Sequence, residues 1–357
     1  MEEIIEHSKF GARKEDKQVV VITGSSGLIG SSLIKRLSKN YRVVGLDRAG
    51  PPYPPLQAEC INFDITNEKA IHAAMERIRY GYGNKIASVI HLAAYYDFGE
   101  KDNPKYHEIN VEGTKKFLRQ LQDFDVDQFL FSSSNLIYKP TEPGVKINED
   151  CPVETNWGYP ESKVLTEDLI KKNNNNIPAV FLRIAGIYTD EGHSIPITQQ
   201  IKRIYEKELL SHFYSGDVNH GDVFVHLEDV VDAVEKTVDK RKDIPNEMAI
   251  NIGEPTSPTY QELQDTIGNL LHGKDWDTYE MPRALAKAGA WARDLVSDPF
   301  IKPWMIDRAG AHYELDIGRA KDYLDWEPKH RIMDTLPKMI EDLKADPEAW
   351  YMKNNLD

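Results

Sequence analysis

The feature that most constrains this chain is a glycine-spaced turn that directly follows an apolar run near the N-terminus. Val19–Ile22 is a short β-branched run, and the segment TGSSGLIG that follows it places Gly24, Gly27 and Gly30 three residues apart. A buried strand, a glycine-rich turn and a helix in this order are typical of a parallel sheet whose first turn binds a phosphate group. The glycine spacing alone is also compatible with a tight strand-to-helix turn that binds no ligand.

Strand-like and helical patterns alternate over the first half of the chain. Further strand-like runs lie at Tyr41–Leu46, Glu59–Phe63, Ser88–Leu92, Gln128–Ser132 and Ala179–Ile184. Helical patterns lie between them at Gly27–Lys39, Glu68–Arg79, Pro104–Gln122 and Tyr159–Lys171. This alternation predicts an α/β fold, a Rossmann-type doubly wound parallel sheet with helices on both faces.

The alternation weakens after about residue 185, and turn residues become more frequent. Helical patterns remain at Ile197–Glu208, Glu228–Lys240, Tyr260–Leu271 and Met333–Ala345. We therefore expect a charged tail at residues 1–17 and a Rossmann domain at 18–185, to which later segments return. Residues 186–357 are expected to form mainly a smaller C-terminal α/β lobe, with the substrate bound between the two parts.

Composition excludes several classes of partner. The 357 residues carry 44 Lys and Arg against 58 Asp and Glu, a net charge of −14, which disfavours binding to nucleic acid. No apolar run approaches the roughly 20 residues of a membrane helix, and the acidic start does not resemble a signal peptide. Because Cys60 and Cys151 are the only cysteines and the histidines lack metal-ligand spacing, we expect a cytoplasmic protein without a metal.

An acidic residue follows the glycine turn at the distance that dinucleotide binding requires. Asp47 ends the second predicted strand, 20 residues after Gly27, where a carboxylate accepts from an adenosine ribose hydroxyl. Such a carboxylate repels a 2′-phosphate, so NAD is favoured, although Arg48 is compatible with NADP. Asp64 is expected either to hold the adenine edge or to begin the helix that follows Asn67. Asp47 alone is equally typical of an ordinary turn at the end of a strand.

A tyrosine and a lysine are placed for acid/base chemistry. Tyr159 and Lys163 are four residues apart on a predicted helix and so share a face. An ammonium group and a positively charged nicotinamide nearby would favour the phenolate form of tyrosine, whose ordinary pKa is near 10. Ser134 follows the apolar run QFLFSS, where open parallel sheets bind ligands. An exposed helix with a chance Tyr–Lys pair and a turn serine are the non-catalytic alternatives.

These segments together resemble the extended short-chain dehydrogenase/reductase superfamily, in its NAD-dependent epimerase/dehydratase family, over roughly residues 18–345. The resemblance rests on TGSSGLIG (23–30), HLAA (91–94), NVEGT (110–114), SSSNLIY (132–138), YPESK (159–163), LRIAGIY (182–188), FVHLEDVVDA (224–233) and RAKDYLDWEP (319–328). It implies that Tyr159 is the catalytic base, that Lys163 lowers its pKa and holds the nicotinamide ribose, and that Ser134 orients the substrate. It also implies a homodimer.

The resemblance extends the set of expected contacts. The expected NAD-binding residues are Gly24, Ser26, Gly27, Leu28, Ile29, Gly30, Asp47, Arg48, Asp64, Ile65, Leu92, Ala93, Ala94, Asn110, Tyr159 and Lys163. The expected substrate contacts are Ser134, Tyr95, Asp222 and Arg308. A solvated charge at a helix end is the alternative for Arg308.

Departures from the family pattern limit what the resemblance implies. Dehydratases of the family carry an acid one or two positions after the catalytic Ser or Thr, whereas this chain has Asn135 and Leu136, which argues against elimination of water. Sugar-nucleotide members often carry an arginine against the diphosphate just before the FVH stretch, where this chain has Asp222. A carboxylate facing a diphosphate is electrostatically unfavourable.

Three functions remain open from the sequence. The first is an NAD-dependent epimerase or dehydrogenase that acts on a sugar nucleotide or a related substrate. The second is a dehydrogenase or reductase of an apolar, steroid- or flavonol-like alcohol or ketone, favoured by Asp222 and by the aromatic residues of the second lobe. The third is a non-catalytic nucleotide sensor. The apolar stretch Ala284–Val296 is expected to belong to the core rather than to a pocket wall.

Overall fold

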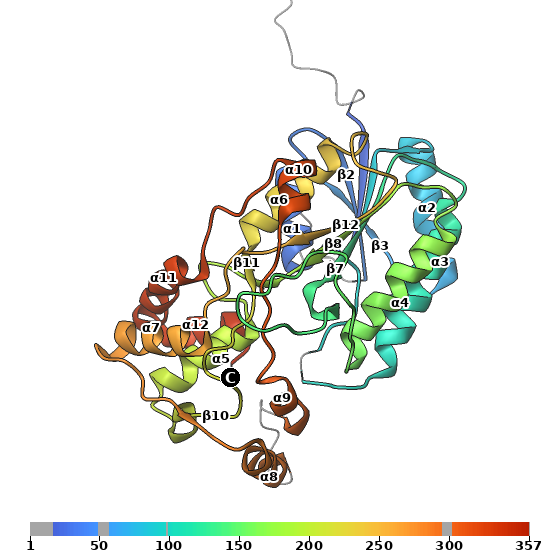
Figure 1. Cartoon of the computed structure of the whole chain (residues 1–357). Helices are drawn as coiled ribbons and strands as arrows, with labels where there is room; N and C mark the ends of the chain where they lie inside the picture. The colour runs from blue at the N-terminus through green and yellow to red at the C-terminus, as the bar shows by residue number, and fades with distance from the viewer. Residues whose placement is uncertain (1–16, 49–56, 98, 295–301, 357) are drawn as a thin grey trace, which may run out of the picture.

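The computed structural model describes residues 17–48, 57–97, 99–294 and 302–356 (Figure 1). The predicted tail at 1–17 lies outside these ranges except for Lys17, whose ammonium donates to the carbonyl oxygens of Ser38 and Lys39. No helix in these ranges is both long enough and apolar enough to span a bilayer.

A seven-stranded sheet forms the centre of the larger part, with strand order β12-β8-β7-β5-β1-β2-β3. Every strand pair in it is parallel. The strands are β1 (Val19–Thr23), β2 (Arg42–Asp47), β3 (Glu59–Asn62), β5 (Ser88–His91), β7 (Phe129–Ser134), β8 (Ala179–Ile184) and β12 (Glu247–Ile252). The order reverses at β1, so the doubly wound sheet predicted from the sequence is confirmed.

Helices cover both faces of the sheet. They are α1 (Leu28–Leu37), α2 (Glu68–Tyr82), α3 (Thr114–Leu121), α4 (Gly158–Asn173), α6 (Leu227–Asp239) and α10 (Gly318–Leu324). Figure 1 shows α2, α3 and α4 on one face and α1, α6 and α10 on the other. Alternate residues of β1 point to opposite faces: Val20 and Ile22 pack in one buried cluster and Val21 in the other.

Two local features of this domain differ from the sequence prediction. The seventh strand, β12, comes from the second half of the chain, where we expected later segments to return to this domain but assigned no strand to 247–252. The helix expected over Pro104–Gln122 is divided into a π-helical segment, η2 (Tyr106–Gly113), followed by α3. At the end of the π-helical segment, Gly113 packs tightly against Ile65. A β-carbon at 113 would lie 3.0 Å from the Ile65 side chain.

A smaller lobe packs beside the carboxyl ends of the strands. Its helices are α5 (Ile195–Tyr205), α7 (Tyr260–His272), α8 (Arg283–Asp294), α9 (Pro303–Arg308), α11 (Ile332–Ala345) and α12 (Pro347–Asn354). Its short strands pair as β9 (Gly186–Tyr188) with β11 (Phe224–His226) and β10 (Phe213–Tyr214) with β13 (Tyr279–Glu280). Short segments complete the order at β4 (Lys85–Ile86), β6 (Asp125–Val126), η3 (Asn135–Ile137) and η4 (Leu209–His212).

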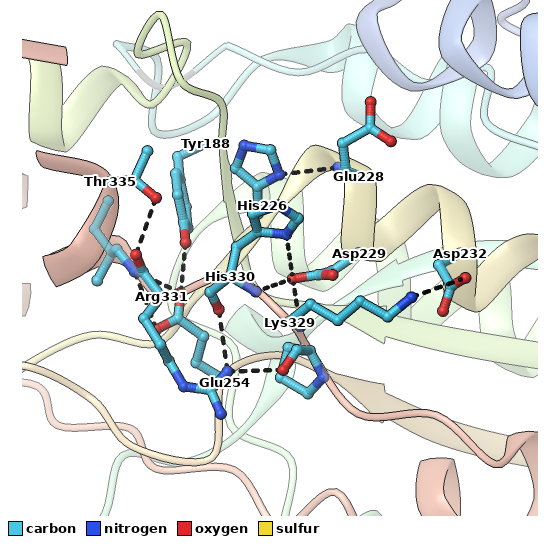
Figure 2. A network of polar contacts seen from close by, with 12 residues as sticks. Tyr188, His226, Glu228, Asp229, Asp232, Glu254, Lys329, His330, Arg331 and Thr335 are labelled. Atoms are coloured by element: carbon cyan, nitrogen blue, oxygen red, sulfur yellow. Dashed lines mark hydrogen bonds and ion pairs between the residues drawn. The ribbon is translucent and has the colours of Figure 1, made fainter. Parts of the chain in front are cut away.

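Buried carboxylates hold the lobe to the sheet (Figure 2). The carboxylate of Glu254, just after β12, accepts from the hydroxyl of Tyr188 at 3.0 Å and from the backbone N–H of Ile332 at 3.1 Å. Asp229 of α6 accepts from the backbone N–H groups of Lys329 and His330. These bonds fix the segment that leads into α11, and therefore the position of the lobe beside the sheet.

The expectation that Ala284–Val296 forms core is wrong for the side chains that the structure describes there. The segment forms the helix α8, but Leu285 is 65% exposed and Ala284 is also exposed. Residues 295 and 296 lie outside the described ranges. The apolar spacing predicted the helix correctly, although it gave no information on what the apolar face packs against.

Candidate active site

A cavity of about 660 Å³ lies between the carboxyl ends of the strands and the smaller lobe. The expected site residues on its wall are Gly24, Gly27, Leu28, Ile29, Gly30, Leu92, Ala94, Ser134, Tyr159, Lys163, Asp222 and Arg308. The structure thus brings the glycine turn, the Tyr–Lys pair and both charged lobe residues to one cavity, as open parallel sheets place ligands.

The glycine turn is shaped by contacts that exclude side chains. Gly24 has a φ of +69°, and a β-carbon there would lie 2.9 Å from the backbone nitrogen of Ala93. A β-carbon on Gly30 would lie 2.7 Å from the Cα of Ser25, so α1 starts in direct contact with the turn. Gly27 precedes the first helical residue of α1, and no side chain among the described residues caps the first N–H groups of this helix. These groups are therefore available to a phosphate.

Asp47 lies directly beneath this turn at the end of β2. Its Oδ2 accepts from the backbone N–H of Ser26 at 2.8 Å, and its Oδ1 accepts from that of Arg48 at 2.7 Å. The Arg48 side chain is exposed. Asp64 is placed differently, because its Oδ1 accepts from both the backbone N–H and the hydroxyl of Thr66. These bonds lower the pKa of Asp64.

Ser134, Tyr159 and Lys163 come from two adjacent elements. Ser134 is the last residue of β7, and its hydroxyl oxygen accepts from the backbone N–H of Leu136 at 3.2 Å. Tyr159 and Lys163 lie one turn apart on α4, which packs against β7. The Lys163 ammonium donates to the carbonyl oxygen of Ser132 at 2.7 Å and lies 5.5 Å from the centre of the Tyr159 ring.

Burial acts on both ionisable groups of this pair. It raises the pKa of the Tyr159 phenol above its ordinary value, and it lowers the pKa of Lys163 to about 7. Both shifts oppose the low phenol pKa expected from the sequence. The protein side chains therefore do not by themselves give a phenolate at neutral pH.

Aromatic rings surround Tyr159. Tyr96 packs edge-on at 4.7 Å between ring centres, and Trp157 and Tyr106 lie at 5.6 and 6.2 Å. Of the two adjacent tyrosines, Tyr96 is the one on the cavity wall. The hydroxyl of Tyr95, the residue expected from the sequence, instead lies among Asp97, Glu100 and Asn103. The sequence contains both tyrosines, but the chain has left β5 there, so strand alternation could not select between them.

The remaining expected residues support the cavity from behind its wall. Asn110 is buried, and its amide bonds both backbone groups of Tyr95 and the hydroxyl of Ser162. The backbone N–H of Ala93 donates to the hydroxyl of Thr23, and Ile65 packs beneath Gly113. In the ranges that the structure covers, these residues order the segments that carry Tyr96 and Ala94.

His91 was not anticipated as part of this support. It is buried at the end of β5, with one ring nitrogen 2.8 Å from the hydroxyl of Thr23 and the other 2.8 Å from that of Thr114. Burial lowers its pKa to about 3, so the ring is neutral and takes part in one donor and one acceptor bond. It therefore acts as a structural link rather than as an acid or base.

Asp222 and Arg308 lie on the part of the cavity wall formed by the lobe. The Asp222 carboxylate accepts from the backbone N–H of Val223 at 2.8 Å, while burial raises its pKa. Arg308 donates to Asn156 at 3.0 Å and lies 5.6 Å from the centre of the Trp157 ring. This end of the cavity thus presents a carboxylate and a guanidinium together.

The comparison with protein families matches this geometry. The model of the NAD dependent epimerase/dehydratase family matches residues 20–253, which include the glycine turn, Ser134, Tyr159 and Lys163. The chain belongs to this family. NAD is the cofactor of the family, as the sequence predicted.

Relatives within the family include two kinds of enzyme. The chain is 27% identical to a putative UDP-glucose 4-epimerase of Methanocaldococcus jannaschii, over 74% of this chain and 86% of that protein. It is 25% identical to a decarboxylating sterol-4-alpha-carboxylate 3-dehydrogenase of Candida albicans, over 92% of this chain and 99% of that protein.

A solved structure agrees with the fold. The UDP-glucuronic acid 4-epimerase from Bacillus cereus, in complex with UDP-glucuronic acid and NAD, superposes with a TM-score of 0.70. Its sequence is 22% identical, and the match covers 92% of this chain and 99% of that one. The family membership and this likeness confirm the Rossmann-type fold.

Proposed function

We propose that this family member transfers a hydride between NAD and the carbon of a secondary alcohol or its ketone, with Tyr159 as the acid/base. The observation that carries the proposal is that the glycine turn, Ser134, Tyr159 and Lys163 line one cavity. A purely nucleotide-sensing protein would need the glycine turn but not the Tyr–Lys pair and its serine.

The residues present fit NAD. A β-carbon on Gly27 would meet, among the described residues, only the Gly24 carbonyl oxygen at 3.4 Å, so the backbone at the start of α1 stays open to a pyrophosphate. Asp47, held beside the turn by Ser26, provides an acceptor for a ribose hydroxyl and an unfavourable charge for a 2′-phosphate. Lys163 is the donor expected to bind the nicotinamide ribose. When bound, the oxidised nicotinamide accepts the hydride.

Tyr159 and Ser134 handle the oxygen of the substrate in this proposal. The Tyr159 oxygen takes the hydroxyl proton while the carbon loses its hydride, and it returns the proton in the reverse direction. Ser134 donates a hydrogen bond to the same oxygen. Because burial raises the Tyr159 pKa, the charges of Lys163 and the oxidised nicotinamide have to offset that burial.

The first candidate reaction is epimerisation of a sugar nucleotide. It is supported by the relatives described as UDP-sugar 4-epimerases. Hydride transfer with one acid/base is sufficient for this reaction, and Arg308 provides a cation for a phosphate. Such an enzyme would return the hydride to the other face of the ketone and would show no net NADH.

The second candidate is net oxidation or reduction of an apolar secondary alcohol or ketone. It is favoured by Asp222, whose carboxylate lies on the cavity wall at the lobe, and by the relatives described as steroid and sterol dehydrogenases. The wall of the same cavity also includes the apolar residues Phe213, Phe224, Met305 and Ile306. Asp222 favours this candidate, whereas Arg308 favours the first one, so the conversion assay decides between them.

The test uses purified protein, NAD and two sets of probes. UDP-glucose and UDP-glucuronic acid represent the first candidate, and a 3β-hydroxysteroid represents the second. Net NADH with the steroid supports dehydrogenation, and a 4-epimer without net NADH supports epimerisation. Tight NAD binding with no conversion of any probe by wild-type protein, at any pH tested, would count against both. We also propose the homodimer implied by the family resemblance, which sedimentation velocity tests.

A further inference from the structure

We propose that Glu167 is a positioning residue that keeps Lys163 charged and fixes the end of the strand that carries Ser134. The inference rests on the proposed function, since the charge of Lys163 matters for catalysis only if Tyr159 exchanges a proton with the substrate. It adds a residue that the sequence analysis did not anticipate.

Lys163 is a buried ammonium whose immediate surroundings carry little compensating charge. Its side chain is 2% exposed, and its hydrogen bond goes to a neutral acceptor, the carbonyl oxygen of Ser132. The ring of Phe131 lies 4.8 Å from the ammonium nitrogen. An ammonium in such a site tends to lose its proton, which agrees with the pKa of about 7.

Glu167 provides a negative charge one helical turn further along α4. It is 3% exposed, and its charge raises the pKa of Lys163 against the effect of burial. Its carboxylate is held rigidly, because Oε1 accepts from the Arg183 Nε at 3.1 Å and Oε2 accepts from the Arg183 Nη2 at 2.8 Å. The geometry is bidentate, which fixes the direction of the carboxylate as well as its position.

The same carboxylate also holds the catalytic strand. Its Oε1 accepts from the hydroxyl of Ser133 at 2.6 Å. Ser133 lies between Ser132, whose carbonyl binds the Lys163 ammonium, and Ser134. One buried side chain therefore links the charge state of Lys163 to the placement of the two serines on either side of Ser133.

The other ionisable groups that lie near Lys163, Tyr159 or Glu167 come from four elements. Tyr159 is on α4 itself, His91 ends β5, Tyr106 is on η2 and Arg183 is on β8. His91 is neutral, because burial lowers its pKa to about 3. Arg183 is a cation 2.8 Å from the Glu167 carboxylate, and the Lys171 ammonium lies 3.8 Å from the same oxygen. Glu167 is thus the acid, among the side chains that the structure describes here, whose charge supports the Lys163 ammonium.

The test compares two variants with opposite effects. Glu167→Gln keeps the size of the side chain but removes its negative charge, so the pKa of Lys163 should fall. Arg183→Gln removes the buried cation bound to Glu167 and leaves only the more distant Lys171 beside that carboxylate, so the pKa of Lys163 should rise. A role in stability alone would weaken folding in both variants without moving the Lys163 titration in opposite directions. The double variant removes both charges and avoids a lone buried ion.

The titration is read from the carbon-13 signal of the lysine Cε atoms, assigned to residue 163 by its loss in Lys163→Arg. We expect a midpoint near 7 in the wild-type protein and about one pH unit lower in Glu167→Gln. The affinity for NAD should fall off at correspondingly lower pH. An unmoved midpoint in Glu167→Gln, or a shift of both single variants in one direction, overturns the inference.

Two outcomes separate this inference from the proposed function. If the midpoints move as expected but no probe is oxidised or epimerised, the function fails and the link between Glu167 and Lys163 stands. If Glu167→Gln does not fold, the upward shift in Arg183→Gln and a return toward the wild-type midpoint in the double variant decide the question. Absence of the upward shift in Arg183→Gln overturns the inference.

Discussion

Gly30, on the first turn of α1, lies against the carbonyl oxygen of Gly24, so that a β-carbon at position 30 would approach that oxygen more closely than van der Waals contact allows. This contact sets the start of the helix against the turn that precedes it. The contact explains why the six-residue separation of Gly24 and Gly30 predicts a strand–turn–helix unit, whereas the presence of two glycines alone would not.

Replacement of Gly30 by alanine should therefore displace the turn. We expect Gly30→Ala to weaken NAD binding by about 10- to 100-fold, as measured by calorimetry, because overpacking of this size costs about 1–3 kcal/mol. Gly81→Ala is the matched control in helix α2, since a β-carbon there meets nothing within 4 Å. Equal NAD affinities for the two variants would show that the turn does not bind the cofactor.

Tyr159→Phe should remove the acid/base and leave the aromatic packing in place. The rate of substrate oxidation should fall by about 100- to 10,000-fold, while NAD affinity stays within a few-fold of wild type. Tyr95→Phe serves as the control, because the Tyr95 hydroxyl lies among Asp97, Glu100 and Asn103. A larger loss of rate in Tyr95→Phe than in Tyr159→Phe would reverse our assignment.

Asp222 should determine how the cavity discriminates against anions. We expect Asp222→Asn to bind UDP-glucose at least about tenfold more tightly than the wild-type protein, because a carboxylate on the cavity wall that would repel the diphosphate is removed. Asp217→Asn changes the same net charge in the preceding loop, at a carboxylate with a half-exposed side chain, and should have little effect. If both variants bind UDP-glucose as the wild-type protein does, Asp222 does not face the bound substrate.

Glu254 should make folding stability fall as pH rises. Burial raises its pKa from 4.5 to about 7, so between these values the folded chain holds a proton that the unfolded chain has lost. The favourable protonated state is fully present below about pH 4.5 and is lost as pH rises through 7. From pH 5 to pH 8, the unfolding free energy of Glu254→Gln should gain up to about 3 kcal/mol relative to wild type.

Urea unfolding at several pH values measures this difference. Glu341→Gln, which changes a carboxylate with a side chain 76% exposed, should give a curve parallel to that of the wild-type protein. If the difference in unfolding free energy between Glu254→Gln and the wild-type protein stayed constant from pH 5 to pH 8, Glu254 would not titrate in that range.

Sequence patterns predicted correctly those features that depend on residues close together in the chain. The β-branched run at 19–22 and the glycine turn after it determine a strand, a turn and a helix within a dozen residues, and the structure confirms all three. The four-residue spacing of Tyr159 and Lys163 likewise predicted that both face the same side of α4.

Features that depend on long-range packing were not accessible in this way. The position of β12 beside β8 is set by contacts between segments more than 60 residues apart in the chain. The choice of Tyr96 over Tyr95 depends on how α4 and η2 pack together, and the pairing of Glu167 with Arg183 depends on how α4 packs against β8. The apolar spacing of α8 predicted a helix correctly. It did not specify which element the apolar side chains pack against, and Leu285 is in fact exposed.

The most direct test of the account is a single-turnover measurement of hydride transfer. Protein saturated with NAD is mixed rapidly with each alcohol probe, with protium or deuterium on the carbinol carbon, and the near-ultraviolet absorbance of NADH is followed. We expect NADH to form in the first turnover with one probe class. Deuterium on the carbinol carbon should slow its formation, and Tyr159→Phe should abolish it. NADH formation that is unchanged in Tyr159→Phe would contradict the account.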